Sequence, residues 1–391
     1  MPLLAEEQIK SRPRVDAVRD AGLVGDGVTD NLSKLPSLLA YTTSPTVYFR
    51  PGIYLIGCPA QHSAASDISL IGAGQDVTTL KLSVGCTLSS NNLFLWQSGS
   101  TGQTTGTGIR VSGFTLDLNG ASRIGSVVSV LGFNGISDGS VDHVSIINGG
   151  SGFINLISRV AGSAGSRHFS ITDNYLALGA SSTNQNQCIL TSSAGGGGIL
   201  GGDVLRNRCI KTAMDISGHA LNIRDNEIIG WGYGGGITTE ANADTYSLVI
   251  TGNRSHDSST TVDPAGGPCI ESWAANSIIS RNAAYNCATD GIANGGRNTT
   301  VSDNVAYGNG KAADGRPYCG VVARHEDSSF TADNSVYIRN RAYDDGSGYQ
   351  KYGYCDNKGV AHIRLVRNNF DGNAIGRTKI LGTDGDDATS G

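Results

Sequence analysis

Short hydrophobic segments recur along most of the chain, and many of them end in a turn that contains asparagine. From about residue 109 onward, an alternating strand pattern leads into such a turn and then into a glycine-initiated hydrophobic strand. A spacing of roughly 20 to 35 residues is typical of solenoids, and no helical 3.6-residue period appears between the copies. The asparagine-containing copies are residues 171–174, 223–226, 250–253, 279–282, 301–304 and 365–368. The pattern predicts a right-handed parallel β-helix whose turn asparagines stack between coils.

The N-terminal part follows a different pattern. Residues 32–41 place apolar side chains at near-helical spacing, as expected for a cap that covers the first coil of a solenoid. Residues 46–56 predict strand, turn and strand around Pro51 and Gly52. We therefore predict an all-β fold, a single-stranded right-handed parallel β-helix with a short N-terminal helical cap. Its parts are the cap at residues 1–45, the β-helix at 46–377 and an acidic Gly/Asp tail at 378–391.

Composition excludes several classes of protein. The chain has 55 glycines in 391 residues, no three-residue glycine period and a net charge of only −5, so it is neither collagen nor a disordered polyelectrolyte. We expect no membrane partner, because no stretch of about 18 apolar residues occurs. We expect no nucleic-acid partner, because a pI near 5.8 offers no basic surface for phosphate. Residues 1–7 lack the basic and apolar regions of a secretory signal.

The eight cysteines show no zinc-site spacing. We interpret them as small buried hydrophobic residues, with one or two disulfides between adjacent coils as the alternative. No metal site and no organic cofactor are expected from the motifs in the body of the chain.

Glycine-hydrophobic starts set five strands in one register. The aligned residues are Met214, Ile237, Ile270, Ile292 and Val321. Strand side chains alternate between faces, so if these five point inward, a polar set points outward. The opposite register would bury three carboxylates at several kcal/mol each. The predicted outward residues are Asp215, Glu240, Glu271, Trp273 and Arg324, with His219 and His325 close to them in sequence.

These residue types suit chemistry on a sugar. Carboxylates on neighbouring coils would lie about 5–10 Å apart, the range of glycosidase acid pairs, and their repulsion would raise the pKa of one of them. An exposed tryptophan can stack on a sugar ring, and an arginine can bind a carboxylate or sulfate. We predict acid, base or nucleophile roles for Asp215, Glu240 and Glu271, and substrate binding by His219, Trp273, Arg324 and His325. The alternative is a solvated polar face without catalytic function.

Two N-terminal motifs resemble a known superfamily. Residues 25–31 (GDGVTDN) and 47–54 (VYFRPGIY) resemble the opening of pectate-lyase-3-type β-helix proteins, and residues 68–82 and 109–120 are similar to its next coils. Residues 349–354 (YQKYGY) are similar to a late coil of that group. The superfamily includes alginate C5-epimerase catalytic modules, polysaccharide lyases and hydrolases, and phage tailspikes. The resemblance implies the fold more specifically than the reaction, because one fold hosts many chemistries.

The chain departs from the epimerase pattern in one segment. Alginate epimerases of this group carry an Asp-Pro-His-Glu segment, whereas residues 152–157 (GFINLI) replace the Asp and the His with apolar residues. The epimerase machinery is therefore not carried over.

Residues 382–391 resemble the first nonapeptide of an RTX calcium-binding repeat. That resemblance implies Ca²⁺ binding and type I export, which needs no N-terminal signal; a flexible acidic tail is the alternative.

Together these observations predict a secreted carbohydrate-active enzyme that cleaves or rearranges glycosidic bonds of a poly- or oligosaccharide. One alternative is a lyase or epimerase acting on a uronic-acid polymer, and another is a glycan-binding phage tailspike or adhesin. A third alternative is an isomerase or cyclase on a partly apolar small molecule, suggested by Ile154, Leu156 and Ile189. Monomer and homotrimer both remain open.

Overall fold

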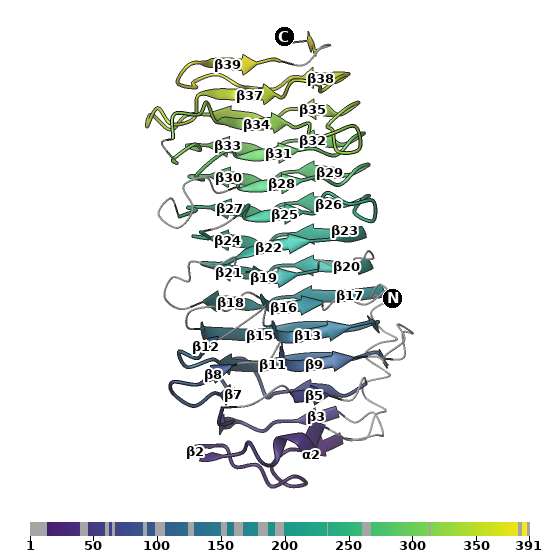
Figure 1. Cartoon of the computed structure of the whole chain (residues 1–391), viewed down its shortest axis with the longest axis vertical. Helices are drawn as coiled ribbons and strands as arrows, with labels where there is room; N and C mark the ends of the chain where they lie inside the picture. The colour runs from purple at the N-terminus through teal and green to yellow at the C-terminus, as the bar shows by residue number, and fades with distance from the viewer. Residues whose placement is uncertain are drawn as a thin grey trace. The chain divides into compact units, whose positions relative to one another are not determined.

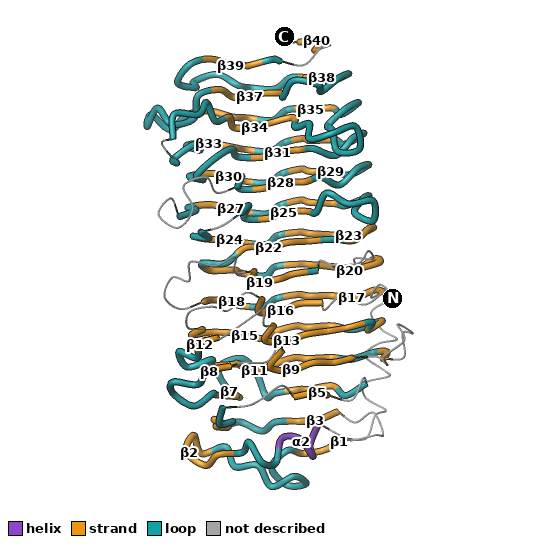
Figure 2. The backbone as a smooth tube through the Cα atoms, viewed as in Figure 1, coloured by secondary structure: helices purple, strands orange, loops and turns teal. Residues whose placement is uncertain are grey.

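The computed structural model describes most of the 391 residues. The described ranges are 14–39, 46–58, 62–64, 67–88, 92–97, 106–123, 129–149, 155–159, 167–178, 187–191, 199–232, 234–259, 267–312, 314–381 and 385–388. Two compact units make up the chain, Met1–Arg208 and Cys209–Gly391. In each unit, short strands from successive coils pair in parallel and form three stacks (Figures 1 and 2). The all-β parallel β-helix predicted from the sequence is therefore confirmed.

The described residues of the N-terminal unit form three stacks and two short strand pairs. The first stack is β1 (Arg14–Asp16), β3 (Thr46–Tyr48), β6 (Ser69–Ile71), β11 (Arg110–Asp117), β15 (Ser140–Gly149), β17 (Arg167–Thr172) and β20 (Ile199–Leu205). The second is β2 (Asp26–Asp30), β4 (Gly52–Leu55), β7 (Thr78–Lys81), the second halves of β11 and β15, and β18 (Tyr175–Leu178). The third is β5 (His62–Ala64), β9 (Asn92–Gln97), β13 (Ser129–Asn134), β16 (Asn155–Arg159) and β19 (Gln187–Leu190). The pairs are β8 (Thr87–Leu88) with β12 (Ser122–Arg123), and β10 (Gly106–Thr107) with β14 (Ile136–Ser137).

The C-terminal unit repeats the same plan with shorter strands. Its first stack is β23 (Gly218–Arg224), β26 (Val249–Thr251), β29 (Ile278–Ser280), β32 (Thr300–Ser302), β35 (Val336–Ile338), β38 (Ile363–Val366) and β40 (Gly385–Ala388). The second is β24 (Glu227–Ile229), β27 (Arg254–His256), β30 (Ala283–Tyr285), β33 (Val305–Tyr307) and β36 (Arg341–Tyr343). The third is β22 (Ala213–Ile216), β25 (Ile237–Thr239), β28 (Ile270–Ser272), β31 (Ile292–Asn294), β34 (Cys319–Ala323), β37 (Tyr352–Asp356) and β39 (Gly376–Lys379). Strand β21 (Arg208–Ile210) spans the boundary between the units in sequence.

The predicted register of the third stack is confirmed. Met214 pairs with Ile237, Ile237 with Ile270, Ile270 with Ile292, and Ile292 with Val321. All five side chains are fully buried, so they form one continuous inward column. Burial of such aliphatic side chains contributes about 1.5–3 kcal/mol each, and the column fixes which neighbouring residues face outward.

The turn asparagines also stack as predicted. In the C-terminal unit, Oδ1 of Asn282 accepts the backbone N–H of Asn253 at 2.9 Å, and its Nδ2 donates to the carbonyl of Ile250 at 2.9 Å and to Oδ1 of Asn304 at 3.0 Å. The buried amide thus satisfies two backbone groups of the preceding coil and bonds to the asparagine side chain of the following coil. Asn340 and, in the N-terminal unit, Asn207 occupy equivalent turns that the sequence pattern did not identify.

Strands extend beyond the predicted limits of the β-helix. The cap segment contains helix α2 (Leu35–Leu39), whose Leu35, Leu38 and Leu39 are buried. It also contains β1 and β2, which pair with β3 and β4. In the predicted tail, the backbone of β40 pairs with β38. Pairing at each end supplies partners for backbone N–H and C=O groups that an open coil would expose. Among the described residues, no helix is long and apolar enough to cross a membrane.

The interpretation of the cysteines as simple buried hydrophobic residues is wrong. Three disulfides link segments of neighbouring coils: Cys58–Cys86, Cys269–Cys287 and Cys319–Cys355. Cys188 and Cys209 are also disulfide-bonded. Sequence spacing of 18 to 36 residues between partners follows the coil length, so coil stacking brings the thiols together although no local motif marks them.

Candidate functional site

The outward face of the third stack in the C-terminal unit holds the predicted polar residues. Each of the five residues Asp215, Glu240, Glu271, Trp273 and Arg324 is partly exposed, whereas the inward column is fully buried. Asp215 pairs with Thr238, and Thr238 pairs with Glu271. These side chains therefore lie on the outward face of the third stack, as the sequence register predicts.

A carboxylate–arginine cluster lies at the centre of this face, formed by Glu271, Asp290 and Arg324. Arg324 directs Nη1 to Oε1 of Glu271 and Nη2 to Oδ2 of Asp290, the latter at 3.1 Å. The exposed fractions of the three side chains are 13 % for Glu271, 12 % for Asp290 and 24 % for Arg324. Two largely buried acids thus share a single cation.

Small residues on the intervening strand allow this contact. Glu271 on β28 and Arg324, directly after β34, flank β31, as the successive arrows in Figure 1 show. Ala293 of β31 pairs with Glu271, and Gly295 follows the same strand. A Cβ atom at Gly295 would lie 2.1 Å from the ring of Trp273. Only glycine fits there, and the six-membered ring of Trp273 packs against its backbone.

Asp290 is the site residue that the sequence reasoning missed. It lies in the turn before β31, outside the strand alternation on which the prediction depended. Its Oδ1 accepts the backbone N–H of Cys319 at 2.8 Å, and its carbonyl accepts the N–H of Cys269 at 3.0 Å. The available signal was an acidic residue immediately before the Gly291-Ile292 strand start, a position held by Gly235 and Pro268 in the two preceding coils.

Burial sets the electrostatics of the cluster. Desolvation raises the pKa of Glu271, Asp290 and Glu326 raise it further, and Arg324 and a hydrogen bond from Trp273 oppose the rise. Burial likewise raises the pKa of Asp290 against the opposing effects of Arg324 and the Cys319 N–H. Because desolvation favours the neutral carboxyl, the arrangement favours retention of a proton within the cluster.

The other two predicted acids lie on neighbouring coils. Asp215 stands two strands from Glu271 in the same column, which places their Cα atoms about 10 Å apart at ~4.8 Å per strand. Glu240 directly follows β25, and its Oε2 accepts a hydrogen bond from Nδ2 of Asn242 at 2.8 Å. The three predicted acids therefore share one face on three successive coils.

The two predicted histidines, His219 and His325, contact residues outside the carboxylate–arginine cluster. His219 belongs to β23 and stacks on Tyr246 with ring centroids 4.7 Å apart. His325 bridges to Thr331, and its imidazole would lie 3.0 Å from a Cβ atom at Gly359. Within the described part of the chain, neither imidazole hydrogen-bonds to Glu271, Asp290 or Arg324. Their assignment to substrate binding remains a prediction.

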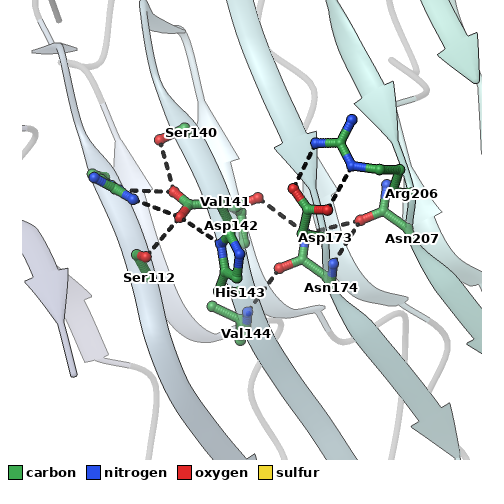
Figure 3. A network of polar contacts seen from close by, with 11 residues as sticks. Ser112, Ser140, Val141, Asp142, His143, Val144, Asp173, Asn174, Arg206 and Asn207 are labelled. Carbon is green, nitrogen blue, oxygen red and sulfur yellow. Dashed lines mark hydrogen bonds and ion pairs between the residues drawn. The ribbon is translucent and has the colours of Figure 1, made fainter. Parts of the chain in front are cut away.

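A buried carboxylate in the N-terminal unit provides a contrast (Figure 3). Asp142 accepts two hydrogen bonds from Arg110, at 2.8 and 2.7 Å, and one from Ser112 at 2.7 Å, and it contacts Nδ1 of His143 at 3.1 Å. Burial raises the pKa of Asp142, but the hydrogen bonds from Arg110 and Ser112 outweigh it and leave the pKa below the ordinary value. This carboxyl is therefore held ionised in a structural network, unlike Glu271.

The apolar residues and the acidic tail singled out from the sequence do not contribute to this face in the described structure. Ile154 and the side chain of Leu156 lie outside the described residues, as do the side chains of residues 382–391, on which the calcium prediction rests. Ile189, one of the residues that suggested an isomerase or cyclase on an apolar substrate, is fully buried and pairs with the inward Ile157, so it does not face a substrate on the outer surface. No group of three or more His, Cys, Asp or Glu residues in the described ranges is arranged to hold a metal ion.

Comparison with known proteins identifies the family. Residues 16–263, more than half of the chain, match the family described as rhamnogalacturonase A/epimerase, pectate lyase-like. The chain belongs to this family. No match was found among curated protein sequences. The pectate lyase-like assignment agrees with the resemblance seen in the N-terminal motifs and with the parallel β-helix.

Solved structures similar to this pectate lyase-like chain are distant in sequence. The A-module of a mannuronan C-5 epimerase from Azotobacter vinelandii has a TM-score of 0.68 at 17 % identity, over 96 % of this chain and 100 % of that one. A surface adhesin of Streptococcus pneumoniae has a TM-score of 0.62 at 14 % identity, over 96 % and 93 %. A hyperthermoactive exopolygalacturonase from Thermotoga maritima has a TM-score of 0.56 at 13 % identity, over 94 % and 96 %. At these identities the likeness shows the shared fold.

Proposed function

We propose that this protein is an extracellular enzyme that hydrolyses glycosidic bonds in a poly- or oligosaccharide, with Glu271 as the general acid. The observation on which this rests is the carboxylate–arginine cluster, in which two buried carboxyls share one guanidinium and burial raises the pKa of Glu271. A general acid of a glycosidase needs a carboxyl that keeps its proton at working pH.

The contacts of the cluster favour Glu271 as the protonated member. Asp290 accepts N–H groups on both oxygens, from Cys319 and Arg324, and these hydrogen bonds suit an ionised carboxylate. The negative charges of Asp290 and Glu326 both raise the pKa of Glu271. Arg324 would then act as a positioning residue that balances Asp290 and orients Glu271.

Asp215 is our candidate for the second carboxylate. The Cα atoms of Asp215 and Glu271 lie about 10 Å apart, and the Glu271 carboxyl is directed away from β22 toward Arg324. This arrangement is too wide for the retaining geometry, in which the carboxyls lie about 5–5.5 Å apart, and leaves room for a water molecule between acid and base. We therefore propose inversion at the anomeric carbon. Glu240, on the coil between them, would contact the substrate or act as the alternative base. Trp273, anchored on Gly295, would supply an aromatic surface for a sugar ring.

Three further observations support an extracellular carbohydrate-active role. The family match is to a rhamnogalacturonase A/epimerase group, and one similar structure is an exopolygalacturonase. The disulfides Cys58–Cys86, Cys269–Cys287 and Cys319–Cys355 suit an oxidising compartment. Lyase chemistry would instead require a cation that is available to stabilise an enolate-like intermediate, and Arg324 is already shared by two acids.

A polysaccharide panel with two readouts tests this proposal. Purified full-length protein is incubated with neutral, uronic and amino-sugar polymers, and new reducing ends and absorbance near 235 nm are both followed. Hydrolysis predicts reducing ends without absorbance. Absorbance together with reducing ends would show a lyase, and binding without either product would show a glycan-binding protein such as an adhesin; either result would overturn the proposal.

A further inference from the structure

The guanidinium of Arg324 is already occupied. Its Nη1 pairs with Glu271 and its Nη2 pairs with Asp290, and three-quarters of the side chain is buried. A uronate carboxylate would need the same planar edge for bidentate binding. Binding a uronate there would displace one of the two acids and leave Glu271 buried without its hydrogen-bond donor or Asp290 buried without its counter-charge, and either outcome is costly.

The rest of the outward face adds negative charge. Asp215 and Glu240 lie on the two coils before Glu271, and Glu326 acts on Glu271 from the segment after β34. Tyr318 acts on Arg324 but donates its hydroxyl to Asp314 at 2.7 Å, and its pKa of about 12 keeps it neutral.

Cations are scarce among the described residues of the two outward columns that contain Asp215 and Glu240. In the outward columns that contain Asp215 and Glu240, Arg324 is joined only by Lys379 of β39, which pairs with Cys355. Lys379 stands four strands from Glu271, about 19 Å away at ~4.8 Å per strand. That distance exceeds the Debye length of about 8–10 Å at physiological salt, so Lys379 does not balance the acids around Glu271.

We infer that the sugar unit bound at the carboxylate–arginine cluster is uncharged, although the family and its structural relatives include proteins named for uronic-acid polymers. This inference rests on the proposed function and specifies its substrate class. Sugar hydroxyls can donate to the carboxylates without repulsion, and the apolar face of a neutral ring can pack on Trp273. A uronate at the same position meets several carboxylates, and the cation of the cluster, Arg324, is already paired with two of them.

Matched polymer pairs test the inference. Each uronic polymer, such as polygalacturonate, is compared with the same polymer after chemical reduction of its carboxyls to primary alcohols. We expect kcat/KM to be at least about tenfold higher on the reduced member of a cleaved pair than on the uronic member. This ratio should fall toward one as the salt concentration rises. Equal or better cleavage of the uronic member would overturn the inference.

Binding measured by affinity electrophoresis on the same pairs separates the two proposals. Preferential retention by the reduced polymers without any cleavage would overturn the proposed hydrolase activity and still support the uncharged substrate class. Preferential retention by the uronic polymers would overturn the substrate class even if hydrolysis occurs.

A charge-neutralising variant gives a second test. Glu326 lies outside the carboxylate–arginine cluster and is exposed, so Glu326→Gln should fold normally. At the pH optimum of each protein, it should raise the ratio of kcat/KM on the uronic member to kcat/KM on the reduced member about two- to fivefold. Asp76→Asn, which removes an exposed acid in the N-terminal unit, serves as the control. Equal effects of the two substitutions on the uronic polymer would contradict local repulsion at the cluster.

Discussion

Nη2 of Arg324 lies 3.1 Å from Oδ2 of Asp290, although 34 positions separate the two residues in sequence. The contact forms because the turn before β31 and the end of β34 meet on the same face of successive coils. Glu271 occupies the other terminal nitrogen of the same guanidinium. One cation therefore contacts two buried acids, and the stability and the chemistry of this face both depend on it.

Replacing the shared cation should destabilise the fold in a pH-dependent manner. Arg324→Gln leaves the ionised Asp290 buried without a counter-charge and removes the hydrogen bond from Arg324 to Glu271, and we expect a loss of about 3–5 kcal/mol in the free energy of unfolding at neutral pH. Without the guanidinium, the pKa values of both carboxyls rise further above their ordinary range, so the folded variant binds more protons than the unfolded chain. Stability is then lost as pH rises and recovered as pH falls. Urea titrations across a pH series measure this.

The matched control is Arg339→Gln. Arg339 forms a bidentate ion pair with Asp303 on an exposed turn, at 2.6 and 2.8 Å. Exposed ion pairs contribute little to stability, so the free energy of unfolding of this variant should stay close to that of the parent protein at every pH. A loss for Arg324→Gln that is no larger than the control, or that does not change with pH, would argue against a shared buried cation.

The alkaline limb of the pH–rate profile should report Glu271. Because burial raises the pKa of this carboxyl, kcat should stay high above the ordinary titration range of a glutamic acid and fall as Glu271 loses its proton. Removing the negative charge of Glu326 lowers the pKa of Glu271, so Glu326→Gln should move the limb toward lower pH. The measurement is kcat against pH for both proteins. A limb that stays in place or moves to higher pH would exclude Glu271 as the titrating acid.

The disulfide Cys319–Cys355 should matter for turnover as well as for stability. Cys319 donates its backbone N–H to Asp290, so the disulfide restrains a backbone group that positions Asp290 in the carboxylate–arginine cluster. Cys58–Cys86 closes a similar length of chain in the N-terminal unit, 28 residues against 36. Chain entropy predicts a loss of about 3.5–4 kcal/mol for either pair. We expect the double Cys→Ser variant at 319 and 355 to lower kcat at least about tenfold, and the variant at 58 and 86 to retain it.

Thermal melting and turnover of the two double variants, measured at a temperature where both are folded, provide the check. Equal turnover in the two variants would show that Cys319–Cys355 contributes only to stability.

The core register makes a stability prediction. Ile270 lies in the fully buried column between Ile237 and Ile292, so Ile270→Ala should cost about 2–5 kcal/mol. Thr238 pairs with Glu271 on the outward side, so Thr238→Ala should cost little. Urea denaturation of the two variants compares them directly. Losses of similar size would mean that the two positions do not face opposite sides of the strand.

Repetition explains why the fold was predictable from sequence. The inward column from Met214 to Val321 recurs at every coil, so a single rule of alternation located it together with the outward Asp215 and Glu271. The asparagine ladder was predictable for the same reason, because Asn253 and Asn282 end similar segments. Because the coils have similar sequences, the inward and outward positions inferred in one coil can be checked against those of the next.

The candidate site was only partly predictable, because its decisive contacts are not repeated. Asp290 lies in a turn, where the alternation of side chains gives no direction. The contact of Arg324 with Glu271 passes across β31 and depends on the small residues Ala293 and Gly295. The pattern of polar and apolar positions does not show that small side chains are needed there. The cysteine pairs depend on coil length, which varies along the chain. Such contacts follow from three-dimensional stacking rather than from local sequence.

The most direct test of the central claim is the turnover number of Glu271→Gln on a polysaccharide that the parent protein hydrolyses, followed as new reducing ends. The amide keeps the shape of the side chain and removes the titrating proton. General acids contribute about 10²–10⁴-fold, so we predict that kcat falls at least a hundredfold while the melting temperature stays close to that of the parent. Near-normal turnover in a folded Glu271→Gln protein would contradict the account and place the chemistry elsewhere on the molecule.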